Sequence, residues 1–242
     1  TGRTGLLPRH GVDLAMSSSS QPVDFPPQGL RYKALPIAWV ASCRHVLIAG
    51  GSYETESRLR HAMMFDWVSI RVVVDTITPF LRQARRRDLR INLHERAVLE
   101  QDIAQADFVI EDTGDLALAQ RIAEWCEVHH KPLNACDKPD LCDLYYMSLV
   151  TLGPMVLGIS SGGDAPAVSS TLRRWLEHNL SPGWAMAAGV MADLRRSLPS
   201  GQARMDLLKG VARHDSFLEL IEQNDRTGLQ KLISDELRRI ST

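Results

Sequence analysis

Short apolar runs alternate with longer segments of mixed polarity from residue 35 to residue 136. Such runs, bounded by polar and turn-forming residues, predict buried strands, and apolar residues repeating every three or four positions predict helices. The predicted strands are Val46–Ala49, Ile70–Val74, Arg90–Leu93, Phe108–Asp112 and Pro132–Cys136, with Leu35–Val40 as a short strand or extended arm. The predicted helices are Glu54–Met64, Pro79–Arg86, Leu99–Ala104 and Leu116–His129. This alternation indicates an α/β fold whose parallel sheet is covered by helices on both faces.

The pattern changes after residue 143. An apolar stretch, Leu144–Leu152, is followed by a turn at Gly153-Pro154 and a predicted strand, Met155–Ile159. A helix is predicted over Ala167–Asn179. The remainder, Trp184–Thr242, is expected to be helical, with breaks near Pro199–Gly201 and Asn224–Gly228.

Composition excludes two classes of protein. The 242 residues carry a formal net charge of −1, which leaves no basic excess for a general nucleic-acid binder. No apolar run approaches the roughly 18 residues that span a bilayer, so we expect no membrane partner. The four cysteines lack the spacing of a zinc site, and we expect reduced thiols of a cytoplasmic protein. The Ser- and Pro-rich first thirty or so residues lack a signal-peptide pattern and predict a disordered leader.

The stretch Val46–Glu54 has the order of strand, glycine turn and helix start. Backbone N–H groups in such a turn converge on one spot and can hold a pyrophosphate, and Asp75 at the end of the next strand could accept hydrogen bonds from a ribose. The spacing Gly50-x-Ser52-x-x-Thr55 departs from the dinucleotide fingerprint Gly-x-Gly-x-x-Gly. The stretch therefore fits either a dinucleotide site or an ordinary strand–turn–helix unit.

Several polar residues follow the predicted strands and should share one edge of the sheet, beyond the carboxyl ends where ligands bind. They are Gly50–Ser52, Asp75, Asp112, Thr113 and Asp137. A second candidate anion site is Ser160–Gly163 at the start of the helix Ala167–Asn179, although an ordinary helix cap with a glycine turn explains it equally well. Arg173 and Arg174 on that helix are solvated surface residues or partners of a polycarboxylate.

The order of these motifs resembles the precorrin-2 dehydrogenase/sirohydrochlorin ferrochelatase family, the N-terminal module of siroheme synthase. The resemblance runs from about Leu35 to Leu232. It is carried by Leu35-Pro36-Ile37, Val46–Gly51, Asn134–Pro139, Gly153-Pro154 and, most specifically, Ile159–Pro166, which is similar to the SSGG-x-[SA]-P signature of the family.

This resemblance implies a Rossmann-like domain over residues 34–143, a dimerisation and tetrapyrrole-binding segment over 144–182, and a helical domain over 183–242, after the leader 1–33. It also implies a homodimer that oxidises precorrin-2 to sirohydrochlorin with NAD and then inserts Fe²⁺ as a substrate. No metal-ligand spacing occurs in the sequence, so the metal site stays unknown.

The resemblance assigns roles to individual residues. Asp137 falls on the shared acid and would act as general base in the oxidation and assist metal insertion, although a simple turn residue before Lys138-Pro139 is the alternative from the sequence alone. The cofactor-binding residues would be Gly50, Gly51, Ser52, Tyr53, Glu54, Asp75, Thr76 and Thr113. The substrate-binding residues would be Ser160, Ser161, Gly162, Gly163 and Asn134, the last by orienting the loop before Asp137.

The departures from the family all fall in the cofactor half. Where the family has three consecutive glycines, this chain has Gly50-Gly51-Ser52. In addition, Glu111-Asp112 adds negative charge beside the expected cofactor. An alternative therefore stays open, in which the protein is a tetrapyrrole chelatase or a non-catalytic tetrapyrrole-binding homologue without dehydrogenase activity.

Overall fold

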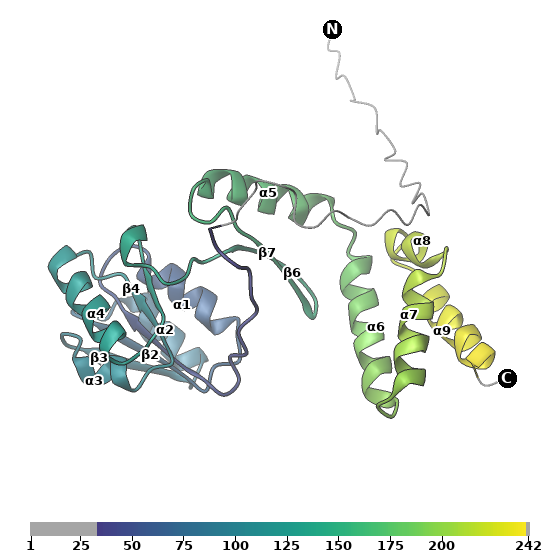
Figure 1. Ribbon diagram of the computed structural model, residues 1–242, viewed down its shortest axis with the longest axis horizontal. Helices are drawn as coiled ribbons and strands as arrows, with labels where there is room; N and C mark the ends of the chain where they lie inside the picture. The colour runs from purple at the N-terminus through teal and green to yellow at the C-terminus, as the bar shows by residue number, and fades with distance from the viewer. Residues whose placement is uncertain (1–32, 241–242) are drawn as a thin grey trace, which may run out of the picture. The chain divides into compact units, whose positions relative to one another are not determined.

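The computed structural model describes residues 33–240, apart from the side chain of residue 240 (Figure 1). The predicted leader, except for Lys33, lies outside the described residues. The sequence predicted either a short strand or an extended arm for Leu35–Val40. The chain forms neither helix nor strand there, so this segment is an extended arm. Its Trp39 ring packs 5.9 Å from the ring of Phe108 and attaches the arm to the sheet.

Five parallel strands form the central sheet in the order β3-β2-β1-β4-β5. Their bounds are β1 His45–Ala49, β2 Ser69–Val74, β3 Ile91–Glu95, β4 Phe108–Glu111 and β5 Leu133–Ala135. The chain builds outward from β1 to β3 and then crosses back, so that β4 pairs with the other side of β1. Ligands of such sheets bind beyond the carboxyl ends of the strands, where the strand order reverses. This arrangement confirms the predicted Rossmann-like α/β fold.

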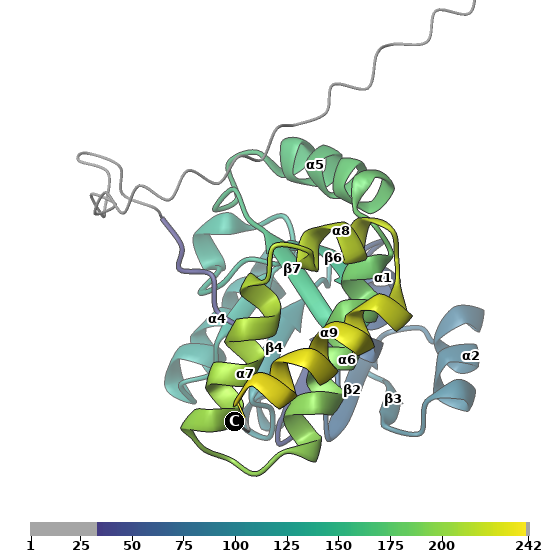
Figure 2. The same ribbon diagram turned by 90° about the vertical axis from the view of Figure 1, so that its right-hand side faces the viewer.

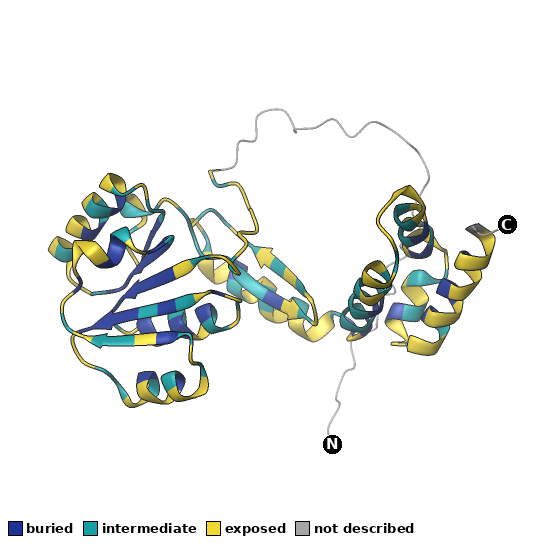
Figure 3. Ribbon diagram, turned by 90° about the horizontal axis from the view of Figure 1, so that it is seen from below, coloured by how far each residue is buried: buried dark blue, intermediate teal, exposed yellow. Residues whose placement is uncertain are grey.

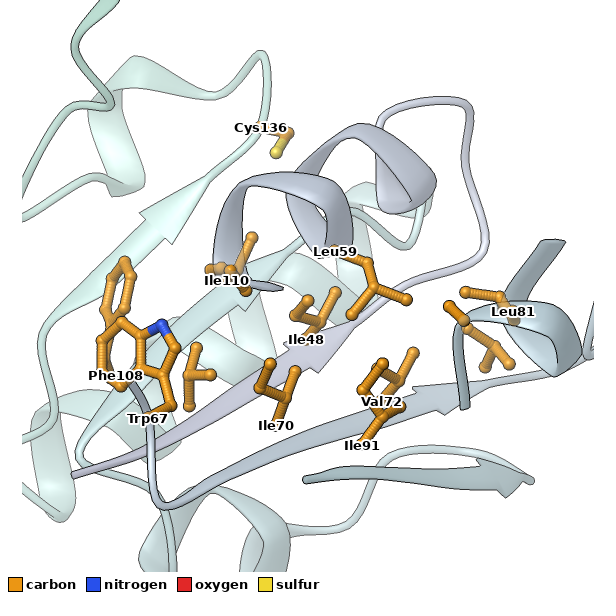
Figure 4. Close-up of a cluster of buried hydrophobic side chains, with 14 residues drawn as sticks. Ile48, Leu59, Trp67, Ile70, Val72, Leu81, Ile91, Phe108, Ile110 and Cys136 are labelled. Carbon is orange, nitrogen blue, oxygen red and sulfur yellow. The ribbon is translucent and has the colours of Figure 1, made fainter. Parts of the chain in front are cut away.

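Helices cover both faces of the sheet. Their bounds are α1 Thr55–Met63, α2 Pro79–Arg87, α3 Glu100–Ala104 and α4 Leu116–Val128. Leu59 of α1 packs on the face that carries Ile48 and Val72, with α2 on the same side (Figure 4). Ile103 of α3 and Ile122 of α4 pack with Leu47 and its neighbours on the other face. The central strands β1 and β4 are buried on both sides, apart from His45, which explains the apolar runs in their sequences (Figure 3). The edge strand β3 is only partly buried and is more polar.

The segment after β5 begins with a single 3₁₀ turn, Pro139–Leu141, and continues into a two-stranded antiparallel hairpin. The hairpin consists of β6 Ser148–Leu152 and β7 Met155–Ile159, and α5 Pro166–Asn179 follows. The predicted turn at Gly153-Pro154 is present, with Gly153 at φ +55°. The sequence did not predict β6, because its residues lack a regular alternation of apolar and polar positions.

Four further helices, α6 Gly183–Ser197, α7 Gln202–Arg213, α8 Phe217–Glu222 and α9 Arg226–Ile240, form a separate apolar core (Figure 2). The predicted break near Pro199–Gly201 is present. The break predicted around Asn224–Gly228 is shorter than expected, because α9 already begins at Arg226. A third break, at His214–Ser216, was not predicted, because it contains neither glycine nor proline. Of the helices within residues 33–240, none combines the length and apolar character that crossing a membrane requires.

Candidate functional site

The glycine turn between β1 and α1 is shaped by the contact between Gly50 and Thr55. A Cβ atom on Gly50 would lie 2.5 Å from the Thr55 side chain, so only glycine fits at this position. Thr55 stands where the fingerprint has its third glycine. The missing Cβ of Gly50 makes the room for it. Gly51, at φ +147°, has the backbone conformation that favours glycine.

The turn is fastened to the loop after β4 by a chain of hydrogen bonds. The Gly51 amide donates to Thr55 Oγ1 (3.0 Å), and the Thr55 hydroxyl donates to Asp112 Oδ2 (2.7 Å). The Ser52 amide donates to the Asp112 carbonyl (2.9 Å). The amides of Gly51 and Ser52 are therefore engaged within the protein. A pyrophosphate at this turn would rely on the Ser52 hydroxyl and on the N–H groups of the first turn of α1, which have no partner within the helix.

Two acidic residues lie beneath the turn, and hydrogen-bond donors offset the cost of burying each carboxyl group. Glu111 is fully buried and accepts hydrogen bonds from Lys138 Nζ (3.0 Å) and from both the amide and the hydroxyl of Thr113. Asp112 is also buried, and this burial raises the pKa of its carboxyl group, while the Thr55 hydroxyl opposes the rise. The sequence identified the added negative charge but not Lys138, which neutralises one of the two carboxylates.

Asp137 follows β5 at the same edge of the sheet. Its side chain is exposed, and its backbone has the left-handed conformation (φ +58°) that few residues other than glycine adopt. The Tyr53 hydroxyl donates to Asp137 Oδ2 at 2.5 Å, which joins the glycine turn to the predicted base. The same hydrogen bond and the charge of Asp137 raise the pKa of Tyr53 to about 12. The structure thus brings together two predicted site residues whose contact the sequence did not indicate.

The residues at this edge fit an NAD cofactor. Asp75 and Thr76 follow β2, adjacent to β1 in the sheet, and both are exposed and available to a ribose. No described atom lies closer than 3.8 Å to a Cβ built on Gly51, so the backbone is open on that side. Glu54 does not point a free charge at the turn, because it pairs with Arg58 at 3.5 Å.

The Ser160–Gly163 loop satisfies its own polar groups. Ser160 Oγ accepts from the Gly162 amide (3.1 Å), and Ser161 Oγ accepts from the Ala165 amide (3.0 Å). Gly162 and Gly163 both have positive φ, and Gly163 packs against the ring of Tyr145. Within residues 33–240, no hydrogen bond connects the two serine hydroxyls to Asp137. Direct substrate binding by this loop stays a prediction.

Asn134 lies in β5 and is buried. Its side-chain amide donates to the Leu144 carbonyl (3.0 Å), across the loop that carries Asp137. This position agrees with the expected role of orienting that loop. Among the described residues, no group of three or more His, Cys, Asp or Glu side chains could hold a metal ion.

The comparisons with known proteins agree with this geometry. A family model described as "NAD(P)-binding" matches residues 37–148. The siroheme biosynthesis protein met8 of Schizosaccharomyces pombe is 28% identical over 168 residues, which are 68% of this chain and 63% of that protein. A siroheme synthase of Thiobacillus denitrificans is 31% identical over 177 residues, 70% of this chain and 36% of that protein. The chain thus spans less than two thirds of the length of these curated relatives.

A solved structure, SirC, a precorrin-2 dehydrogenase, has the same fold, with a TM-score of 0.64 and 17% identity. The superposition covers 84% of this chain and all of that one. The structural match shows the shared fold, and the family model and the relatives show what the sequence is similar to. The chain is thus similar to siroheme synthases and to the siroheme biosynthesis protein met8, in agreement with the family that its motif order resembles.

Proposed function

We propose that the protein catalyses the NAD-dependent oxidation of precorrin-2 to sirohydrochlorin in siroheme biosynthesis. One observation carries this proposal. Asp137, the expected base, is exposed at the carboxyl edge of the sheet and is hydrogen-bonded to Tyr53 of the glycine turn. A group that removes a proton from the substrate must lie next to the cofactor that accepts the hydride, and the pair Tyr53–Asp137 places these two functions side by side.

We assign cofactor binding, proton removal and substrate contact to different residues. The Ser52 hydroxyl and the start of α1 would hold the pyrophosphate beside Gly50 and Gly51, and Asp75 and Thr76 would hold the adenosine ribose. Bound NAD⁺ supplies the acceptor for the hydride equivalent. The Asp137 carboxylate takes the proton that leaves the same substrate, so that two electrons and two hydrogens are accounted for. Ser160–Gly163 would lie against the tetrapyrrole, and Thr113 would line the cofactor side.

Iron insertion is a second proposed activity, with Fe²⁺ as substrate. It is supported by the names of the relatives, which refer to siroheme, and by the exposed Asp137 carboxylate, which can accept a pyrrole proton as the metal enters.

A different observation favours a chelatase or a tetrapyrrole-binding protein without dehydrogenase activity. The amides of Gly51 and Ser52 are engaged internally, which weakens the pyrophosphate site.

We also propose a homodimer in the cytoplasm. Val168, Leu172 and Trp175 repeat along one face of α5 and are all exposed. Three large apolar side chains on one exposed stripe favour contact with a second copy. The free cysteines agree with a reducing compartment. Equilibrium sedimentation of the wild type and of Trp175→Glu tests the dimer, with the variant expected to be monomeric.

The test of the oxidation uses wild type, Asp137→Asn and Asp137→Ala. Asparagine keeps the side-chain size and tolerates the left-handed backbone but cannot act as a base. We expect the wild type to convert precorrin-2 with NAD⁺ to a product with sirohydrochlorin absorbance, and both variants to lose this activity while binding NAD⁺ in calorimetry. A wild type that binds sirohydrochlorin but not NAD⁺ would instead support the chelatase or the binding protein.

A further inference from the structure

A pocket of about 480 Å³ lies between α1, the start of the hairpin and α5. Its walls include Arg58 and His61 of α1, Tyr146 and Met147 before β6, and Arg173 and Glu177 of α5. This volume lies within the usual range for small-molecule sites. Of these residues, the sequence singled out only Arg173, as either a surface residue or a partner of a polycarboxylate.

Arg58 forms a fixed positive wall of this α1–α5 pocket. Its Nε donates to Cys136 Sγ at 3.3 Å, and its guanidinium lies 4.9 Å from the centre of the Tyr146 ring. Cys136 directly precedes Asp137 in the chain, so this arginine borders the loop that carries the proposed base. The side chain is largely buried, and it is held in place by contacts with the sheet edge, the hairpin segment and Glu54 of its own helix.

His61 supplies an unsatisfied polar atom. Its ring stacks on Tyr146 with centroids 5.9 Å apart, and its Nδ1 is buried without a hydrogen-bond partner among the described residues. Burial, together with the nearby charges of Arg58 and Arg173, lowers the pKa of His61. A buried nitrogen of this kind is costly unless a ligand or water binds it.

Arg173 faces this group from α5. It pairs with Glu177 at 2.6 Å, four residues along the same helix, and both side chains are about one third exposed. Exposed pairs of this type contribute only a few tenths of a kcal/mol, so an incoming carboxylate can replace Glu177 at low cost. Arg174, the next residue, is instead exposed, and its guanidinium donates to Thr171 (3.3 Å) on the same helix.

We propose that the α1–α5 pocket is a subsite for the acidic side arms of the tetrapyrrole, with Arg58 and Arg173 binding a carboxylate and His61 donating a hydrogen bond to it. This inference rests on the proposed function, because precorrin-2 and sirohydrochlorin carry acetate and propionate arms. A guanidinium binds a carboxylate through two parallel hydrogen bonds, which fixes the orientation of the arm. The pocket would thereby set the position of the macrocycle relative to Asp137.

The experiment compares Arg173→Met with Arg174→Met, a matched control on the same helix. Sirohydrochlorin is titrated by absorbance against each full-length protein, and NAD⁺ binding is measured by calorimetry. We expect Arg173→Met to weaken sirohydrochlorin binding about tenfold, the lower end for a hydrogen bond to a charged group, and Arg174→Met to change it less than about twofold. NAD⁺ binding should stay unchanged in both. The methyl ester of sirohydrochlorin should bind equally to wild type and Arg173→Met.

Equal sirohydrochlorin affinity of Arg173→Met and wild type, or an equal loss with the ester, would overturn the subsite. Arg58→Met provides a second variant, for which folding is first checked by thermal unfolding. Precorrin-2 oxidation is assayed separately. A wild type that binds sirohydrochlorin through Arg173 but does not oxidise precorrin-2 would overturn the proposed oxidation and leave the subsite standing.

Discussion

The Tyr53 hydroxyl and the Asp137 carboxylate, 84 residues apart in the chain, are joined by a 2.5 Å hydrogen bond at the edge of the sheet. The bond links the turn that would hold the cofactor to the residue that would take the proton. The hydrogen bond therefore fixes the direction of the proposed base.

Tyr53→Phe should separate orientation from proton transfer. The variant keeps the ring but removes the donor, so the Asp137 carboxylate loses its fixed direction. We expect the turnover of precorrin-2 to fall about tenfold, less than the hundredfold or greater loss expected when a general base is removed. The unfolding temperature should stay unchanged, since Tyr53 is exposed. A loss as large as that of Asp137→Asn would assign Tyr53 a direct part in the chemistry.

The left-handed backbone of Asp137 gives a second prediction, on stability. Asp137→Gly and Asp137→Ala both remove the carboxylate and its bond to Tyr53, but only glycine adopts φ +58° without steric cost. We expect the alanine variant to be less stable than the glycine variant by about 1 kcal/mol in urea unfolding. Both should be equally inactive. Equal stabilities would mean that the turn relaxes when the side chain is removed.

Periodicity predicted the sheet, its four covering helices and the edge where the site lies, because each of these follows from local sequence. Periodicity could not predict contacts between residues that are far apart in the sequence. Glu111 and Lys138 are 27 residues apart, and only the fold shows that the lysine neutralises the buried acid. Likewise, Arg173 and Arg174 are equivalent in the sequence, whereas the packing of α5 places the first in a pocket and leaves the second exposed.

Asp112→Asn should strengthen cofactor binding. Removing one negative charge beneath the turn reduces repulsion of the pyrophosphate, and the amide oxygen still accepts from Thr55. We expect NAD⁺ affinity to rise about fivefold, which corresponds to about 1 kcal/mol of Coulomb energy near a protein surface. Isothermal titration calorimetry measures this change, and unchanged affinity would place the pyrophosphate away from the Gly50–Ser52 turn.

The same variant tests the raised pKa of Asp112. Because burial raises the pKa above its unfolded value, the folded protein holds this proton at a pH where the unfolded chain has lost it. Stability contributed by this group therefore falls as pH rises from the unfolded pKa, about 3.9, through the folded one. Asp112→Asn should be more stable than wild type at pH 7, and the difference should shrink toward pH 3 in thermal unfolding.

Asp75 should determine the choice between NAD⁺ and NADP⁺. Its carboxylate follows β2 and is exposed, where it would accept from the ribose hydroxyls and repel a 2′-phosphate. We expect wild type to bind NAD⁺ at least tenfold more tightly than NADP⁺, and Asp75→Ser to reduce this ratio about tenfold, mainly by losing NAD⁺ affinity. Thr76→Ser keeps the hydroxyl proposed to bind the ribose and should leave the ratio unchanged. An unchanged ratio in Asp75→Ser would move the ribose site elsewhere on the edge.

Asp102 of α3 should be the main source of acid sensitivity in the sheet domain. It is buried and receives two hydrogen bonds from Arg96, at 2.7 and 2.8 Å, and one from Arg71 of β2 at 3.3 Å. Burial alone would raise the pKa of Asp102, but the Arg96 guanidinium, the Leu99 amide and Arg71 together hold it below its usual value. The group therefore stabilises the fold above the unfolded pKa, about 3.9, and this contribution is lost as pH falls through the folded one.

Asp102→Asn tests this sign directly. We expect it to lower the free energy of unfolding at pH 7 by about 2 kcal/mol, because two guanidinium groups lose their charged partner. The deficit should shrink as pH falls through the lowered pKa of Asp102 in the folded protein, where the wild-type carboxylate becomes protonated. Asp193→Asn removes an exposed pair with Arg196 and should change stability by less than about 0.5 kcal/mol at any pH. A deficit of Asp102→Asn that is independent of pH would mean that hydrogen bonding and packing, not the charge, account for the contribution of Asp102.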